Sequence, residues 1–416
     1  MTRRFIHYSN GPLSMKAKIL GIGLLAATVA AVLASPPFRG NAAVPTIVRP
    51  TIEQPPVQTL GKAKVEVVFV LDTTGSMAGL IGAAKEKIWS IAASMAQAQP
   101  APEISMGLVA YRDRGDAYVT RVVDLSTDLD SMYATLMEFA AEGGGDTPES
   151  VNQALHDAVH AMSWSQDPGS YKVVFLVGDA PPHMDYQDDP KYPEIVAAAA
   201  AKGIVVNTIQ CGDLAETAPH WQRIAALGNG RYFQVEQTGS AVVIDTPYDQ
   251  RIAELAAELD ATRLYYGTAA ERSAMEQKLA ATALLHERAS SAAQARRGVF
   301  NASASGAANF IGGQDLVHDV MSGGVELEAL SAAELPPALA ELPPDERRRI
   351  VDETAARREA LQRQINDLAA QRDAFIAERL EEMGGEADSL DRLIYDAVRA
   401  QAASKGLTYD EAGPKF

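Results

Sequence analysis

One short run of oxygen-bearing side chains has the types and the spacing to bind a divalent metal ion. Residues 72–76 read Asp-Thr-Thr-Gly-Ser and directly follow the apolar run 65–71. Hard cations such as Mg2+ take oxygen ligands and keep several waters, so a protein supplies only one or two carboxylates. The same residues would also suit a helix N-cap or an Asx-turn. The run alone therefore leaves both interpretations open.

Two further segments place oxygen ligands at the ends of expected elements. Residues 143–149 read Gly-Gly-Gly-Asp-Thr-Pro-Glu, and Thr147 offers a hydroxyl just before an apolar pattern at helical spacing. The glycines would allow a close approach of the backbone. Residues 173–177 form another apolar run, which ends in Gly178 and Asp179. We expect the three loops to converge on one metal site.

In these three segments the chain resembles the von Willebrand factor type A (VWA) domain, whose metal-ion-dependent adhesion site combines Asp-x-Ser-x-Ser with a distant Thr and a distant Asp. The likeness covers residues 61–245. It implies that ligand oxygens come from Asp72, Thr74, Ser76 and Thr147, and that Asp179 contributes directly or through a water. Thr74 stands where Ser is commoner, and it keeps the hydroxyl. The ion implied is Mg2+, with Mn2+ or Ca2+ as alternatives.

A finer likeness is to the VWA domains of hemicentin-type and alpha-kinase-associated proteins. It rests on residues 111–113, 144–149 and 179–183. Within these stretches, Asp113 and Asp146 are candidates to support the metal ligands from outside the ligand shell.

The order of the expected elements predicts the same fold without the resemblance. Apolar or β-branched runs alternate with helical patterns along residues 61–245, which favours a doubly wound, mostly parallel sheet with helices on both faces. In such sheets, ligands bind outside the carboxyl ends of the strands. The expected strands are residues 65–71, 104–111, 171–177, 204–210 and 231–235.

The length of 416 residues, with 22% charged and 47% hydrophobic residues, predicts a globular chain of more than one unit. The expected division is a signal peptide at 1–43, a proline-rich linker at 44–60, the VWA domain at 61–245, a helical and irregular region at 246–344, and a helical or coiled-coil region at 345–416.

The N-terminal residues have the pattern of an export signal. Lys16 and Lys18 precede an apolar run at 19–34 and small residues up to 43. An uncleaved anchor is the alternative, although this run is short for a span of about 20 residues. We therefore expect a periplasmic or extracellular protein with no stable membrane span after cleavage. Cys211 is the only cysteine, so no intrachain disulfide can form.

The charge excludes one class of partner. The net charge of −17 becomes −22 when residues 1–43, with five Lys or Arg and no acid, are removed. Neutralising phosphates needs clustered basic residues, so nucleic acid is not an expected partner. The resemblance implies instead a protein partner whose acidic side chain completes the metal shell.

The second half of the chain is expected to be mainly helical. Its longest pattern, residues 345–380, repeats Thr354, Leu361, Leu368 and Phe375 at seven-residue spacing. This pattern predicts either a short coiled coil, which could join copies of the chain into a homo-oligomer, or an amphipathic helix packed against residues 249–297. A final helix is expected at residues 389–404.

No group of residues predicts catalysis. His156 and His160 lack the His-Glu-x-x-His arrangement of zinc proteases, and no nucleophile, base and orienting group follow in a credible order. The leading hypothesis is a non-enzymatic, metal-dependent adhesion or assembly module of the bacterial cell envelope. The alternative is a structural envelope protein that acts through its helices, with the metal only stabilising the fold. A third hypothesis is an enzyme or the regulatory partner of one, for example a sensor module linked to a phosphorylation pathway.

Overall fold

The structure is a computed structural model that describes residues 63–235, 244–382 and 390–411. The expected signal peptide and linker lie outside these residues. Within them, no helix combines the length and the apolar character that a membrane crossing requires.

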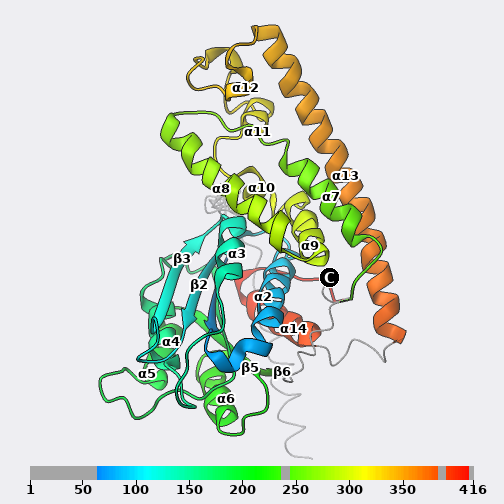
Figure 1. The fold of residues 1–416 in the computed structure, drawn as a ribbon. Coiled ribbons are helices and arrows are strands. Elements are labelled where there is room, and N and C mark those ends of the chain that lie inside the picture. Colours follow the sequence, from blue (N-terminus) through cyan, green and yellow to red (C-terminus); the bar gives the residue numbers. More distant parts are fainter. Residues whose placement is uncertain (1–62, 236–243, 383–389, 412–416) are drawn as a thin grey trace, which may run out of the picture. The chain divides into compact units, whose positions relative to one another are not determined.

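Six strands form one sheet in the order β3-β2-β1-β4-β5-β6 (Figure 1). All neighbouring strands are parallel except β3, which runs antiparallel to β2. The predicted doubly wound, mostly parallel sheet is therefore confirmed, and β3 is an edge strand that the sequence analysis missed. The strands are β1 (Lys64–Asp72), β2 (Glu103–Tyr111), β3 (Thr120–Ser126), β4 (Tyr171–Gly178), β5 (Ile204–Cys211) and β6 (Asn229–Val235).

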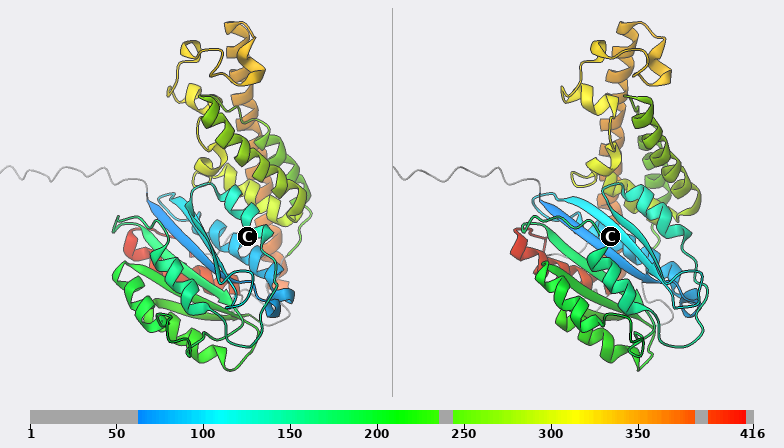
Figure 2. Two further views of the ribbon diagram at one scale, coloured as in Figure 1. Left: turned by 60° about the vertical axis from the view of Figure 1, so that its left-hand side comes forward. Right: turned by 90° about the vertical axis from the view of Figure 1, so that its left-hand side faces the viewer.

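Helices cover both faces of the sheet (Figure 2). In β1, Val67 and Phe69 face one core while Val68 and Val70 face the other, because successive side chains of a strand point to opposite faces. The first core is closed by α2 (Ile81–Met95), α3 (Leu129–Glu138) and α14 (Leu390–Ala402), and the second by α4 (Val151–His160), α5 (Tyr192–Ala201) and α6 (Thr217–Leu227).

The last helix, α14, belongs to the cover of the sheet although it is remote in sequence. Ala397 and Val398 are at most 1% exposed and share a core with β1 and β4. Tyr171 of β4 donates a hydrogen bond of 2.7 Å from its hydroxyl to Gln401 Oε1. The sheet therefore needs the end of the described chain to complete one of its two cores.

Most of the other C-terminal helices contribute to two smaller cores. Helix α13 packs against α7, α9 and α11. Of the two alternatives for residues 345–380, the structure therefore shows the helix packed against residues 249–297. The bounds are α7 (Asp249–Asp260), α8 (Ala269–Arg288), α9 (Ser291–Ala302), α10 (Ala307–Ile311), α11 (Leu316–Met321), α12 (Pro337–Ala340) and α13 (Pro344–Glu382), with 3-10 turns η1 (Gly75–Gly79), η2 (Leu327–Ala329) and η3 (Ala403–Lys405).

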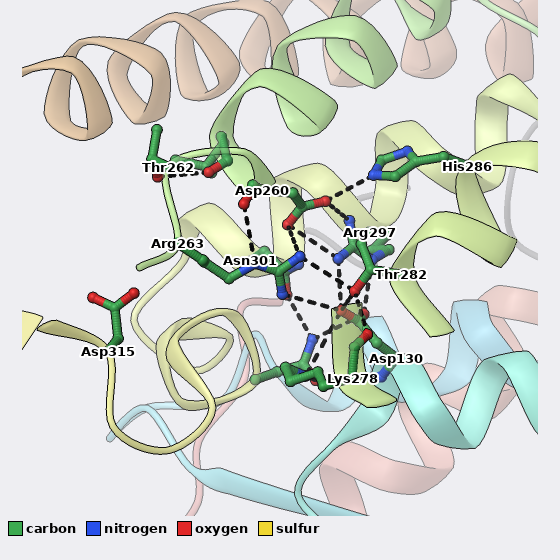
Figure 3. Close-up of polar contacts among 12 residues, drawn as sticks. Asp130, Asp260, Thr262, Arg263, Lys278, Thr282, His286, Arg297, Asn301 and Asp315 are labelled. Carbon is green, nitrogen blue, oxygen red and sulfur yellow. Dashed lines mark hydrogen bonds and ion pairs between the residues drawn. The ribbon is translucent and has the colours of Figure 1, made fainter. Parts of the chain in front are cut away.

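A buried cluster of charges joins these helices to the sheet unit (Figure 3). Asp130 of α3 is fully buried and accepts hydrogen bonds of 2.7 and 2.6 Å from the guanidinium of Arg297 in α9. The same guanidinium donates to Asp260 of α7 at 2.7 Å. Burial alone would raise the pKa of Asp130, but Arg297, Lys278 and Arg263 outweigh it and hold that pKa well below its usual range. The cluster therefore keeps its charges and ties α3 to α7, α8 and α9.

Candidate metal centre

The carboxylate of Asp72 stands at the carboxyl end of β1, at the base of the candidate site. Its Oδ1 accepts hydrogen bonds from the backbone N–H of Thr74 at 2.9 Å and from the Thr74 hydroxyl at 2.7 Å. This contact is an Asx-turn, one of the two alternatives for the run. The helix-cap alternative is not observed, since the Thr74 side chain caps no N–H of the following turn. The other oxygen, Oδ2, is buried and has no hydrogen-bond partner among the described residues.

Ser76 and Asp179 continue the site toward the surface. The Thr74 and Ser76 hydroxyl oxygens lie 3.1 Å apart, and Ser76 donates a hydrogen bond of 2.9 Å to Asp179 Oδ1. Asp72 and Thr74 are buried, whereas Ser76 is exposed. The structure thus brings four of the five sequence-predicted ligands into one hydrogen-bonded chain that opens to solvent.

Gly178 allows the two aspartates to approach each other. It ends β4, which pairs directly with β1. A Cβ at this position would overlap the hydroxyl of Tyr111 and lie only 2.9 Å from Asp72 Oδ2. A larger residue here would therefore displace the unpartnered oxygen of Asp72.

Thr147, the fifth predicted ligand, is placed differently. Its side chain is exposed, and within the described residues it makes no hydrogen bond to the other four ligands. Glu149, two residues later, is buried instead, and its Oε2 lacks a hydrogen-bond partner. A Cβ built at Gly144 would lie 3.5 Å from Thr74 Cβ and 3.6 Å from Glu149 Oε1, which places Glu149 beside Thr74. Sequence reasoning missed Glu149 as a site residue, although the Thr-Pro-Glu segment that carries it was identified.

The glycine loop supplies the backbone geometry for this approach. Gly143 and Gly144 have φ values of +78° and +81°, which favour glycine. The Gly75 N–H donates to the Gly143 carbonyl at 3.1 Å, and a Cβ on Gly75 would come within 2.8 Å of that oxygen. The loop therefore lies against the Asp72 turn at a distance that side chains would prevent.

Burial and mutual repulsion shift the acidity of the site in one direction. Burial, followed by the charge of Asp179, raises the pKa of Asp72 to about 7. Burial, followed by the charges of Asp72 and Asp113, raises the pKa of Glu149 to about 9. Burial also raises the pKa of Asp179. Among the described residues, no Lys, Arg or His forms an ion pair with any of these three carboxylates. The cluster therefore lacks positive charge.

These residues fit an oxygen-liganded divalent cation. Asp72 Oδ2 and Glu149 Oε2 are unpartnered acceptors, and the hydroxyls of Thr74 and Ser76 offer neutral oxygens next to them. A dication would supply the missing charge and would satisfy both orphaned oxygens, whose burial is otherwise costly.

The two predicted supporting residues lie outside this hydrogen-bonded chain. Asp113 is buried and accepts hydrogen bonds from Ser150 at 2.7 Å and from the Tyr186 hydroxyl at 2.9 Å. Asp146 is exposed, with a side chain that is 65% accessible. Both face His183 rather than Asp72.

Known proteins match the sheet-forming half of the chain. Residues 66–247 match the family model of the von Willebrand factor A domain. An ariadne-like RING finger protein of Acanthamoeba polyphaga mimivirus is 21% identical over 201 residues, which make up 44% of this chain and 20% of that protein. The von Willebrand factor A domain-containing protein 7 of Rattus norvegicus is 41% identical over 91 residues, or 22% of this chain and 10% of that protein. The chain thus spans a fifth or less of the length of these curated relatives.

Two solved structures are similar to this chain at lower sequence identity. A von Willebrand factor type A protein from Catenulispora acidiphila is 18% identical with a TM-score of 0.33, over 42% of this chain and 39% of that chain. Proximal thread matrix protein 1 from the mussel byssus, solved with a zinc occupied MIDAS motif, is 15% identical with a TM-score of 0.34, over 42% of each chain.

Proposed function

We propose that this chain, whose residues 66–247 form a von Willebrand factor A domain, is a protein-binding module that depends on a divalent cation. VWA domains generally mediate interactions between proteins. Metal dependence, the acidic partner and the location in the bacterial cell envelope are our proposals.

The observation that carries this proposal is the group of three neighbouring carboxylates without a basic partner. Asp72 and Glu149 are buried, and each has one oxygen without a hydrogen bond. A fold that stabilised these groups by itself would pair them with Arg or Lys, as it does for Asp130. The absence of such a pair at the carboxyl ends of the strands supports a cation as the missing partner.

The arrangement of the ligands supports a cation that remains accessible. Asp72 would hold the ion from below, while the exposed Ser76 hydroxyl marks the side that faces solvent. A dication at this position supplies an open coordination site for a carboxylate oxygen of a partner. Glu149 would determine how strongly the ion attracts the partner's carboxylate oxygen, because each protein carboxylate in the shell neutralises part of the charge of the ion.

We propose a role in binding rather than in catalysis. Ser76 donates its hydroxyl hydrogen to Asp179 Oδ1, and in this proposal the Thr74 and Ser76 hydroxyls are neutral oxygen ligands rather than nucleophiles. We also propose that the closer relatives are the hemicentin-type and alpha-kinase-associated domains, and that the ion is Mg2+, Mn2+ or Ca2+.

Metal-dependent capture by the full chain tests the function. Bait protein immobilised in Mg2+ should retain an envelope protein that EDTA releases, and the Asp72→Asn bait should retain none. Asp213→Asn is the matched control, because Asp213 is exposed. Capture that is equal for Asp72→Asn and wild type, or that EDTA leaves unchanged, would contradict the proposal. The captured protein should in turn lose binding when its contacting Asp or Glu is changed to Asn or Gln.

A further inference from the structure

A second group of metal-ligating side chains lies beside the first site, and no function is assigned to it. One ligand atom each from Asp113, Asp146 and His183 lies within 4.8 Å of the others. We propose that these three residues bind a second divalent cation, of the class that accepts one imidazole nitrogen and carboxylate oxygens, such as Mn2+ or Zn2+. This site is separate from the one built on Asp72.

The buried imidazole of His183 distinguishes this group from a cluster of carboxylates alone. Its side chain is 4% exposed, and its Nε2 is a buried atom without a hydrogen-bond partner among the described residues. That nitrogen lies 3.3 Å from Asp113 Oδ2 and 4.0 Å from Asp146 Oδ2. A buried nitrogen without a hydrogen bond is costly, whereas a metal bond to it would remove that cost.

The other ring nitrogen is held in the manner of a metal-binding histidine. His183 Nδ1 lies 2.7 Å from Asp185 Oδ1, so Nδ1 carries the proton that is donated to this carboxylate. When the ring is neutral, Nε2 therefore presents its lone pair to Asp113 and Asp146. A carboxylate behind an imidazole fixes the tautomer and makes the other nitrogen a better ligand.

Neighbouring side chains hold this geometry in place. The ring of Tyr186 stacks on His183 with centroids 3.9 Å apart, and its hydroxyl donates to Asp113 Oδ2. Ser150 donates to the other Asp113 oxygen at 2.7 Å. Asp113 and the imidazole are therefore preorganised, while the exposed Asp146 can move the short distance needed to close the shell.

The mixed set of nitrogen and oxygen ligands predicts a different preference among metal ions from that of the first site. Imidazole suits Zn2+ and its neighbours, and carboxylates suit Mn2+ as well. The site on Asp72 offers oxygen alone, which suits Mg2+ and Ca2+. Mn2+ is the probe that both sites accept, and its electron spin reports directly on a coordinated nitrogen.

Pulsed electron paramagnetic resonance on the full chain loaded with Mn2+ tests the proposal, together with the number of ions bound in equilibrium dialysis. Wild type should bind two Mn2+ and show nitrogen modulation from one imidazole. His183→Gln should lose one ion and the modulation, whereas Asp72→Asn should lose one ion and keep the modulation. Asp146→Asn, which changes an exposed side chain and should leave the fold intact, should weaken the second ion about tenfold or more.

Asp213→Asn is the control for Asp146→Asn, because Asp213 is also an exposed carboxylate and belongs to neither proposed site. It should leave both ions bound. Wild type without nitrogen modulation, or modulation that survives in His183→Gln, would overturn the proposal. Loss of the modulation in Asp72→Asn would also overturn it, because the imidazole would then belong to the first site. If a protonated His183 paired with Asp113 and no metal bound there, wild type and His183→Gln would each bind one Mn2+ per chain. This result would also overturn the proposal.

Discussion

Replacement of Arg297 by Met should destabilise the whole described unit, because it removes the shared partner of two buried carboxylates. Asp130 has no exposed surface, and Arg297 makes two hydrogen bonds to it and a 2.7 Å contact to Asp260. Leaving a buried charge unpaired costs about 3–5 kcal/mol. Lys278 remains 3.7 Å from Asp130, so we expect a loss of about 3 kcal/mol in the free energy of unfolding rather than the upper value.

Urea unfolding followed by tryptophan fluorescence measures this loss. Trp89 of α2 packs edge-on against Phe300 of α9 with ring centroids 6.2 Å apart, so its emission reports on the same interface. Arg251→Met is the control, since Arg251 is 51% exposed and pairs with Glu254 on the surface, where such pairs contribute at most about 1 kcal/mol. Equal effects of the two substitutions would refute the buried-charge reasoning.

The pH dependence of the same experiment follows from the direction of the Asp130 shift. Because the pKa of Asp130 is lower in the folded state than its ordinary value of 3.8, its contribution is present above that value. It is lost only as the pH falls through the folded pKa. The cost of Arg297→Met should therefore be constant between about pH 5 and 8 and should shrink in stronger acid.

Three further predictions concern the first metal site. The raised pKa values of Asp72 and Glu149, about 7 and about 9, mean that these two groups contribute most to the stability of the metal-free protein below the ordinary carboxyl values, and that this contribution is lost as the pH rises through 7 and 9. The increase in Tm caused by Mg2+ should thus be larger at pH 8 than at pH 5, and a smaller increase at pH 8 would contradict this. Glu149→Gln should weaken Mn2+ binding about tenfold or more in calorimetry while raising the Tm of the metal-free protein at pH 8, because Gln is neutral without the proton that Glu149, with a pKa of about 9, must take up on folding. Gly178→Ala should abolish Mg2+ binding, whereas Gly82→Ala, where a Cβ meets nothing within 4 Å, should leave it unchanged. Unaltered affinity in Gly178→Ala would refute the role given to that close approach.

The fold could be predicted because its signals are local. The buried strands are continuous apolar runs, and the site residues follow directly where two of these runs end. Edge strand β3 was missed because its side chains are half-buried or exposed, so no continuous apolar run marks it. Glu149 was missed as a site residue because the sequence shows only that a Thr and a Glu are two residues apart, and the turn between them decides which one lies beside Thr74.

The role of the helical half depends on pairings that are remote in sequence. Arg358 and Arg372 occupy seam positions of the seven-residue repeat, which argues against a tight coiled coil when they are read alone. In the structure, Arg358 pairs with Asp315 at 2.8 Å and Arg372 pairs with Asp249 at 2.6 Å, so both are satisfied within the chain. Helix α14 likewise has an amphipathic sequence, but only the tertiary structure shows that the sheet is its partner. Deletion of the residues after 245 would therefore expose a core as well as remove the helices.

An anomalous difference map from crystals soaked in Mn2+ would show whether an ion binds at Asp72. We expect a peak within about 2.3 Å of an oxygen of Asp72 and of the Ser76 hydroxyl, with an open or water-filled position toward solvent. The peak should be absent from crystals of Asp72→Asn. Density for solvent alone between Asp72, Ser76 and Asp179 at saturating Mn2+ would contradict a metal site at these residues.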